Sequence, residues 1–210
     1  MKKEDIELLI DNGHGFEQAY KCSPDKRLVE YKFAREIAAR LEERLLADGY
    51  HVRRIVTEES AVPIRERVRR VNRVCSQTTP QRCLLISIHS NAIGDDNRWH
   101  TSRGWSVFVS KKASHNSKRM AELLYQEAMA AGLRGNRATP APDAQGRHFW
   151  TWSWRKDDIT LLTDTACPAV LTENLFHDNR EDVAFMLSEA GKQTIEDLHL
   201  RAIERYIAEM

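Results

Sequence analysis

Residues 83–89, Cys-Leu-Leu-Ile-Ser-Ile-His, form the stretch of sequence that decides the fold. A nearly continuous apolar run of this length is typical of a strand buried on both faces, as in a parallel sheet covered by helices on each side. Four more short apolar runs are predicted as strands: Ile6–Asp11, Tyr50–Val56, Gly104–Ser110 and Ala169–Glu173. Longer stretches with apolar residues at helical spacing are predicted as helices: Val29–Asp48, Val62–Cys75, Ser114–Ala131 and a capped region from about Arg180 to Met210. Strands alternating with helices predict an α/β fold.

The predicted fold is a single domain over residues 1–210, with a twisted, mainly parallel sheet flanked by helices on both faces. The length of 210 residues and the 41% hydrophobic content supply enough apolar material for one core. No linker or repeat divides the chain, and Pro140–Trp154 is predicted as an irregular loop.

Charge and hydropathy exclude two classes of partner. The 32 basic and 31 acidic residues nearly cancel, so we expect no nucleic-acid partner. Five arginines crowd the helix predicted over Val62–Cys75, and we interpret them as a solvated face: Arg65, Arg67, Arg69, Arg70 and Arg73. No apolar run approaches the roughly 18 residues of a membrane span. The first ten residues are predicted as the approach to a strand rather than a signal peptide, which suits a phage-type protein or a trimmed chain.

The four cysteines are scattered and show no spacing typical of a structural zinc site: Cys22, Cys75, Cys83 and Cys167. Free, partly buried thiols are the favoured interpretation. A Cys75–Cys83 bridge is the alternative.

Two histidines follow predicted strands at matching positions. His14 stands between two glycines after the first strand, and His89 ends the central strand. Ligands of open α/β sheets gather at the carboxyl ends of strands. Either histidine alone is typical of a hydrogen-bonded structural residue, but the pair favours a shared ligand.

Glu30 lies on the core-facing side of its predicted helix. With about 100° per residue, Ala34, Ile37 and Leu41 all fall within about 40° of it. A carboxylate buried there costs several kcal/mol unless it is paired or bound to a metal. The alternative is a first-turn glutamate that the helix dipole favours and solvent surrounds. Two imidazoles and one carboxylate form a zinc set that leaves a fourth position for water, so one zinc ion (Zn²⁺) is the expected cofactor.

Glu173 ends the strand Ala169–Glu173 and offers a carboxylate outside this ligand set. A zinc hydrolase needs a base that takes a proton from water and passes it to the leaving amine. Glu173 fits that role. An ordinary exposed acid at a strand end is the alternative.

Four motifs in order along the chain resemble the zinc-dependent N-acetylmuramoyl-L-alanine amidases of the amidase-3 type. They are Asp-Asn-Gly-His-Gly at 11–15, Glu30, Ser-Ile-His-Ser-Asn-Ala at 87–92 and Pro-Ala-Val-Leu-Thr-Glu at 168–173. Arg67 and Asn72 also match the family's arginine and asparagine, and the likeness runs from about Leu8 to Ile207. Two departures concern substrate fit: Asn12 replaces the usual proline, and Asn174-Leu175 replaces a small residue and glycine.

The resemblance implies that His14, Glu30 and His89 bind zinc and that Glu173 is the catalytic acid/base. The implied reaction is hydrolysis of the amide between N-acetylmuramic acid and L-alanine in peptidoglycan, at the cell wall, in the periplasm or outside the cell, by a monomer. The expected substrate contacts are Asn91, Trp150, Trp152 and Asn174. The alternating tryptophans at 150, 152 and 154 suit a wall that stacks on sugar or peptide, or else a core edge.

Two alternative functions remain open at this point. One is a zinc peptidase or carboxypeptidase of related architecture, which the sixteen-position separation of His14 and Glu30 disfavours. The other is an inactive wall-binding module, which the joint presence of all four chemical residues disfavours. Some family members carry a helix that plugs the zinc site. The fourteen residues Ser90–Arg103 show no helical period here, so no plug of several turns is expected.

Overall fold

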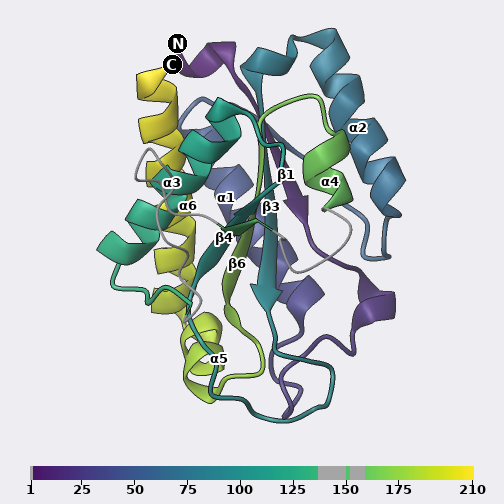
Figure 1. Ribbon diagram of the computed structural model, residues 1–210, viewed down its shortest axis with the longest axis vertical. Helices are drawn as coiled ribbons and strands as arrows, with labels where there is room; N and C mark the ends of the chain where they lie inside the picture. The colour runs from purple at the N-terminus through teal and green to yellow at the C-terminus, as the bar shows by residue number, and fades with distance from the viewer. Residues whose placement is uncertain (1, 137–149, 152–158) are drawn as a thin grey trace.

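A six-stranded sheet forms the centre of the computed structural model, which describes residues 2–136, 150–151 and 159–210 (Figure 1). The strands are β1 (Glu7–Asn12), β2 (His51–Arg54), β3 (Cys83–Asn91), β4 (Ser106–Val109), β5 (Trp150–Thr151) and β6 (Ala169–Phe176), in the order β2-β1-β3-β6-β4-β5. β1, β2, β3 and β6 are parallel neighbours, and β4 runs antiparallel to β6. The predicted mainly parallel α/β sheet is confirmed.

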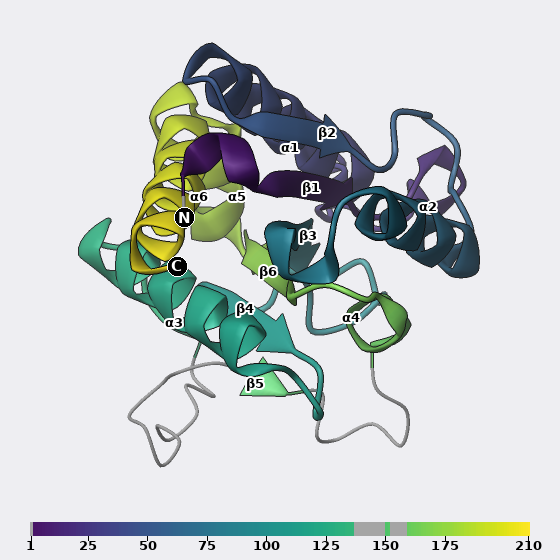
Figure 2. The same cartoon turned by 90° about the horizontal axis from the view of Figure 1, so that it is seen from above.

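Helices cover both faces of the sheet (Figure 2). One layer holds α1 (Glu30–Ala47), α3 (His115–Ala130) and α6 (Glu189–Glu209), and the other holds α2 (Ile64–Gln77) and α4 (Thr160–Asp164). The central strand β3 divides its side chains between the two cores: Leu84 and Ile86 pack in the first, and Leu85 packs in the second with Val71 and Val74. The apolar run is therefore buried on both faces because each face has its own helix layer.

The C-terminal helical region is two helices rather than one. α5 (Arg180–Leu187) is followed by Ser188, whose hydroxyl oxygen accepts a hydrogen bond from the Gly191 amide and caps α6. The short α4 was not predicted, since five residues carry too little periodicity. β5 lies within the predicted irregular loop, and residues 140–149 and 152–154 of that loop lie outside the described residues.

All four cysteines are free, as favoured from the sequence. A hydrogen bond with Cys167 and burial raise the pKa of Cys75 to about 12, which keeps this thiol protonated. No helix among the described residues is long and apolar enough to cross a membrane.

The strand register brings three chain segments to one edge of the sheet. Asn12 of β1 pairs with Ile88 of β3, and His89 of β3 pairs with Glu173 of β6. α1 begins at the same edge with Glu30. Parallel strands end together, so these residues meet although up to 161 positions separate them in sequence.

Candidate metal centre and active site

His14, Glu30 and His89 converge at the carboxyl edge of the sheet. Glu30 Oε1 lies 3.3 Å from His14 Nε2 and 3.0 Å from His89 Nδ1. The imidazole rings stand nearly perpendicular, with centroids 5.0 Å apart. Each residue offers one ligand atom, and these atoms all lie within 4.8 Å of one another. Nitrogen and carboxylate donors at this spacing form a set that can hold a metal ion.

Glu30 is buried, with 2% of its surface exposed, so the alternative of a solvent-exposed first-turn glutamate is wrong. Burial by itself raises the pKa of this carboxyl, but hydrogen bonds with His14 and His89 outweigh it and hold the pKa below its ordinary value. The Ser90 amide also donates a hydrogen bond to Oε1, at 3.3 Å. Glu30 is therefore a charged, oriented carboxylate inside the protein.

Glycines on either side of His14 permit the close approach of its loop. A Cβ at Gly13 would lie 2.3 Å from the His89 ring, and one at Gly15 would lie 2.1 Å from the Ala61 amide nitrogen. His14 itself has a φ of 60°, in the left-handed region that side-chain-bearing residues rarely adopt. Its ring reaches Glu30 from this strained backbone.

Two arginines hold that backbone in place. Arg35 Nη2 and Arg67 Nη2 both donate hydrogen bonds to the His14 carbonyl oxygen, at 3.1 and 3.2 Å. Arg67 Nη1 also donates to the Asn12 carbonyl and to Asp11 Oδ1, at 3.0 and 3.1 Å. Sequence analysis missed this pair of contacts.

Arg67 is 6% exposed, so its assignment to a solvated helix face is wrong. The prediction failed because Arg67 faces β1 and pairs with the fully buried Asp11, whose other oxygen accepts a hydrogen bond from the Ser87 hydroxyl at 2.6 Å. Its neighbours Arg69 and Arg70 do pair at the surface with Glu66.

Glu173 adjoins the three converging residues without joining them. It is 8% exposed, and its Oε2 has no hydrogen-bond partner among the described residues. Burial, with the nearby Glu30 charge, raises the pKa of Glu173 to about 8 against a smaller opposing effect of His89. A carboxyl with such a pKa can take up and release a proton near neutral pH.

Comparison with known proteins decides the family. The model of the N-acetylmuramoyl-L-alanine amidase family matches residues 8–205. The chain belongs to this family. An endolysin of Bacillus phage SPP1 is 23% identical over 198 residues, which cover 92% of this chain and 63% of the endolysin. The chain thus spans less than two thirds of the length of that relative.

Solved amidase structures share the fold. The N-acetylmuramyl-L-alanine amidase of Mycobacterium smegmatis is 19% identical with a TM-score of 0.79, and the match covers 100% of both chains. The catalytic domain of the amidase CwlV from Bacillus (Paenibacillus) polymyxa var. colistinus is 19% identical with a TM-score of 0.75, covering 97% of this chain and 98% of that domain.

The expected substrate contacts of this amidase-family chain have different environments. Asn174 is fully buried: its amide nitrogen donates to the His89 carbonyl at 3.1 Å, and its Oδ1 accepts from Trp105 Nε1 at 2.9 Å. Asn174 therefore supports the His89 backbone from the interior. This role differs from the substrate contact that the sequence predicted. Asn91 ends β3 at the site edge and is partly buried. Trp150 belongs to β5, of which only the backbone is described, and Trp152 lies outside the described residues.

His177 also lies at this edge, and sequence analysis gave it no role. It is 3% exposed, and its Nδ1 lies 3.0 Å from the Ser90 hydroxyl oxygen. Burial lowers its pKa, so the ring is neutral at neutral pH. Its position directly after the β6 strand end was the signal that could have found it.

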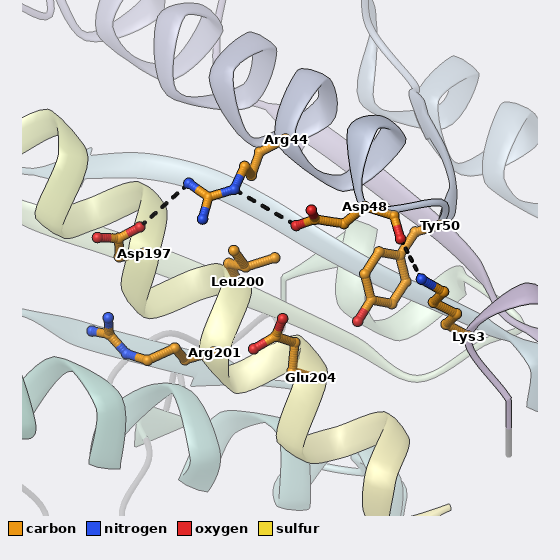
Figure 3. Close-up of a pocket in the computed structure, with 8 residues that line it drawn as sticks. All are labelled: Lys3, Arg44, Asp48, Tyr50, Asp197, Leu200, Arg201 and Glu204. Carbon is orange, nitrogen blue, oxygen red and sulfur yellow. Dashed lines mark hydrogen bonds and ion pairs between the residues drawn. The ribbon is translucent and has the colours of Figure 1, made fainter.

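A cavity of about 600 Å³ lies at the opposite edge of the sheet, between the end of α1 and α6 (Figure 3). Its walls include Lys3 and Tyr50, which precede β1 and β2. Arg44 there pairs with Asp48 at 3.6 Å and with Asp197 at 3.9 Å. Arg44 is thus paired with two carboxylates of the same wall.

Proposed function

We propose that the chain is an amidase that hydrolyses the bond between N-acetylmuramic acid and L-alanine in peptidoglycan. Residues 1–210 act as its single catalytic domain, and His14, Glu30 and His89 hold one zinc ion. The observation that carries this proposal is the convergence of these three ligand atoms beside Glu173, whose Oε2 is unpaired among the described residues, in a chain of the amidase family.

Bound zinc would polarise the amide carbonyl and lower the pKa of a water molecule. The protein's own groups do the rest. Glu173 Oε2 accepts the proton of the attacking water and later delivers it to the departing alanine nitrogen, as the carbon–nitrogen bond breaks and the new carbon–oxygen bond remains. Glu30 is paired with His14 and His89. Arg35 and Arg67, which donate hydrogen bonds to the His14 carbonyl, keep His14 in position.

The proposed substrate places the protein at the cell wall, in the periplasm or outside the cell. The protein acts as a monomer, and Asn91, Trp150 and Trp152 contact the sugar or the stem peptide. The match to a phage endolysin supports a role in wall lysis, and the matches to bacterial amidases support wall remodelling.

The test is a digest of purified soluble muropeptide, with products identified by mass, alongside metal analysis of the protein. An amidase releases an intact peptide that begins with L-alanine, together with the free lactyl sugar. Cleavage within the peptide instead would show a peptidase, and binding without products would show an inactive wall-binding module. Activity should vanish with a chelator and return with added zinc.

A further inference from the structure

Two buried oxygen atoms without hydrogen-bond partners belong to neighbouring strands at the candidate active site. They are Ser106 Oγ and Glu173 Oε2, and neither has a partner among the described residues. Ser106 is fully buried, and Glu173 is 8% exposed. Burying an unpaired hydroxyl or carboxylate costs free energy, so such atoms in a folded protein require a physical explanation.

The strand register places these two residues opposite each other. β4 and β6 lie side by side and run antiparallel, and Ser106 of β4 pairs with Glu173 of β6 (Figure 1). Residues directly opposite each other on antiparallel strands have their side chains on one face of the sheet, with Cβ atoms about 4.5–5.5 Å apart. On its other side Glu173 pairs with His89 of β3. A row of three residues therefore crosses the sheet, from a proposed zinc ligand through the proposed base to the serine.

The neighbours of the pair hold β4 and β6 together on both faces of the sheet. Phe108 and Leu171, two positions further along their strands, pair in register and pack in the second core, on the same face as Ser106. On the opposite face, Trp105 Nε1 donates a hydrogen bond to Asn174 Oδ1 at 2.9 Å. The separation of the two strands is thus fixed at the serine, and apolar side chains border it on the core side.

A serine hydroxyl suits a carboxyl group that changes its protonation state. The hydroxyl donates a hydrogen bond to a carboxylate and accepts one from a carboxylic acid. In the proposed reaction Glu173 passes through both states, because it takes a proton from water and gives it to the leaving nitrogen. Hydrogen bonds of catalytic groups are often long in ligand-free structures and shorten in the substrate complex.

We propose that Ser106 is a positioning residue for Glu173, whose Oε2 accepts a hydrogen bond from the Ser106 hydroxyl while the carboxylate faces the attacking water. This inference rests on the proposed amidase function. A carboxylate oxygen has two lone pairs, so Oε2 accepts this hydrogen bond and still takes the proton of the water. The hydrogen bond holds the Glu173 side chain in one rotamer. Because Ser106 acts through Glu173, its loss should lower kcat more than it changes KM or zinc affinity.

The experiment measures muropeptide hydrolysis by zinc-loaded Ser106→Ala. The expected result is a loss of about tenfold in kcat, the usual value of one hydrogen bond to a charged group, with KM and zinc affinity within about twofold of the wild type. Ser110→Ala is the matched control, because Ser110 is also buried, follows β4 directly and accepts a hydrogen bond from the Lys112 amide at 3.2 Å. This control should keep the wild-type kcat. An unchanged kcat in Ser106→Ala, or an equal loss in both variants, overturns the assignment.

A double-variant cycle distinguishes positioning of Glu173 from a general weakening of the site. In the Glu173→Gln background, Ser106→Ala should change kcat by no more than about twofold, because the group that the serine positions is already lost. A further tenfold loss in that background overturns the proposal. If Ser106→Ala fails to fold, Ser106→Cys replaces it with the same expected loss, because a thiol is a weak donor.

An inactive wild type would contradict the amidase proposal, and the contact between Ser106 and Glu173 is then judged from stability. Urea unfolding compares the wild type, Ser106→Ala, Glu173→Gln and the double variant at pH 9, above the raised pKa of Glu173. The changes in the unfolding equilibrium constant should depart from additivity by about fivefold or more, the behaviour of groups in contact. Additive changes overturn the contact.

Discussion

Replacing Arg67 with methionine tests how the fold supports the candidate metal centre. The guanidinium makes four hydrogen bonds: to Val62, Asn12 and His14 carbonyls and to the Asp11 carboxylate. Arg67→Met keeps most of the side-chain volume and removes every one of these donors. Among the described residues, the fully buried Asp11 side chain then retains the hydrogen bond from the Ser87 hydroxyl alone.

The expected loss in the free energy of unfolding is about 3–5 kcal/mol, the range for breaking a buried ion pair by removing one partner. His14 also loses one of the two donors that hold its carbonyl in the left-handed conformation. Such backbone strain costs on the order of 1–3 kcal/mol, so relaxation of His14 should weaken zinc binding about tenfold or more. Urea unfolding of the metal-free protein measures the first effect, and competition with a chelator measures the second.

Arg70→Met is the matched control on the same helix. Arg70 is partly exposed and pairs with Glu58 and Glu66, so its loss should cost no more than about 1 kcal/mol and leave zinc affinity unchanged. The double variant Asp11→Asn/Arg67→Met should recover part of the lost stability, because no unpaired charge remains buried. If Arg67→Met costs no more stability than Arg70→Met, or if the double variant is as unstable as the sum of its single changes, Arg67 does not support the fold through Asp11.

Four further predictions concern the site. His89→Ala should lose stoichiometric zinc and hydrolysis together, because two ligands hold the ion poorly; full zinc occupancy in this variant would contradict the ligand set. Glu173→Gln should keep zinc and lose about 10²–10⁴ in kcat, whereas loss of metal would make Glu173 a ligand. In the metal-free protein the pKa of Glu173 is raised to about 8, so the folded protein holds a proton that the unfolded chain releases. The free energy of unfolding is therefore highest below the unfolded pKa and falls as the pH rises through 8. Urea unfolding at pH 5 and pH 9 should therefore show a loss of a few kcal/mol in the wild type that is absent from Glu173→Gln. Zinc-loaded wild type should cleave muropeptide without an activator, because residues 92–105 form no helix that covers the site. A wild type that is inert, together with an active variant in which Ile93–Ser102 is shortened, would contradict this prediction.

The sequence predicted those features that local pattern determines. The apolar run at residues 83–89 indicated a central strand because such a composition is typical of a strand covered on both faces. The helical position of Glu30 among Ala34, Ile37 and Leu41 indicated a buried carboxylate, which the structure has. His14 and His89 were found because strand ends of a parallel sheet meet at one edge.

Features that depend on long-range packing escaped prediction. Arg67 was grouped with four other helix arginines as a solvated face, although it stands four and seven positions before Val71 and Val74, whose side chains are buried. Only the packing of α2 against β1 turns it toward Asp11. Asn174 likewise looked available to substrate because it follows Glu173, but the partners of its amide, Trp105 and the His89 carbonyl, come from distant segments.

The carboxyl edge of the sheet combines features that are each unfavourable for the ligand-free fold. His14 has a strained backbone, and both Glu173 and Asp178 have a buried carboxylate oxygen without a partner among the described residues. The α/β fold does not need this strained backbone or these unpaired oxygens, because its stability comes from its two apolar cores. Groups kept in unfavourable states by a stable surrounding are pre-organised for ligands that relieve them. In the proposed enzyme a bound metal would satisfy the His14, Glu30 and His89 set and Glu173 would take the proton of the attacking water, so binding and chemistry would act on the same edge of the sheet.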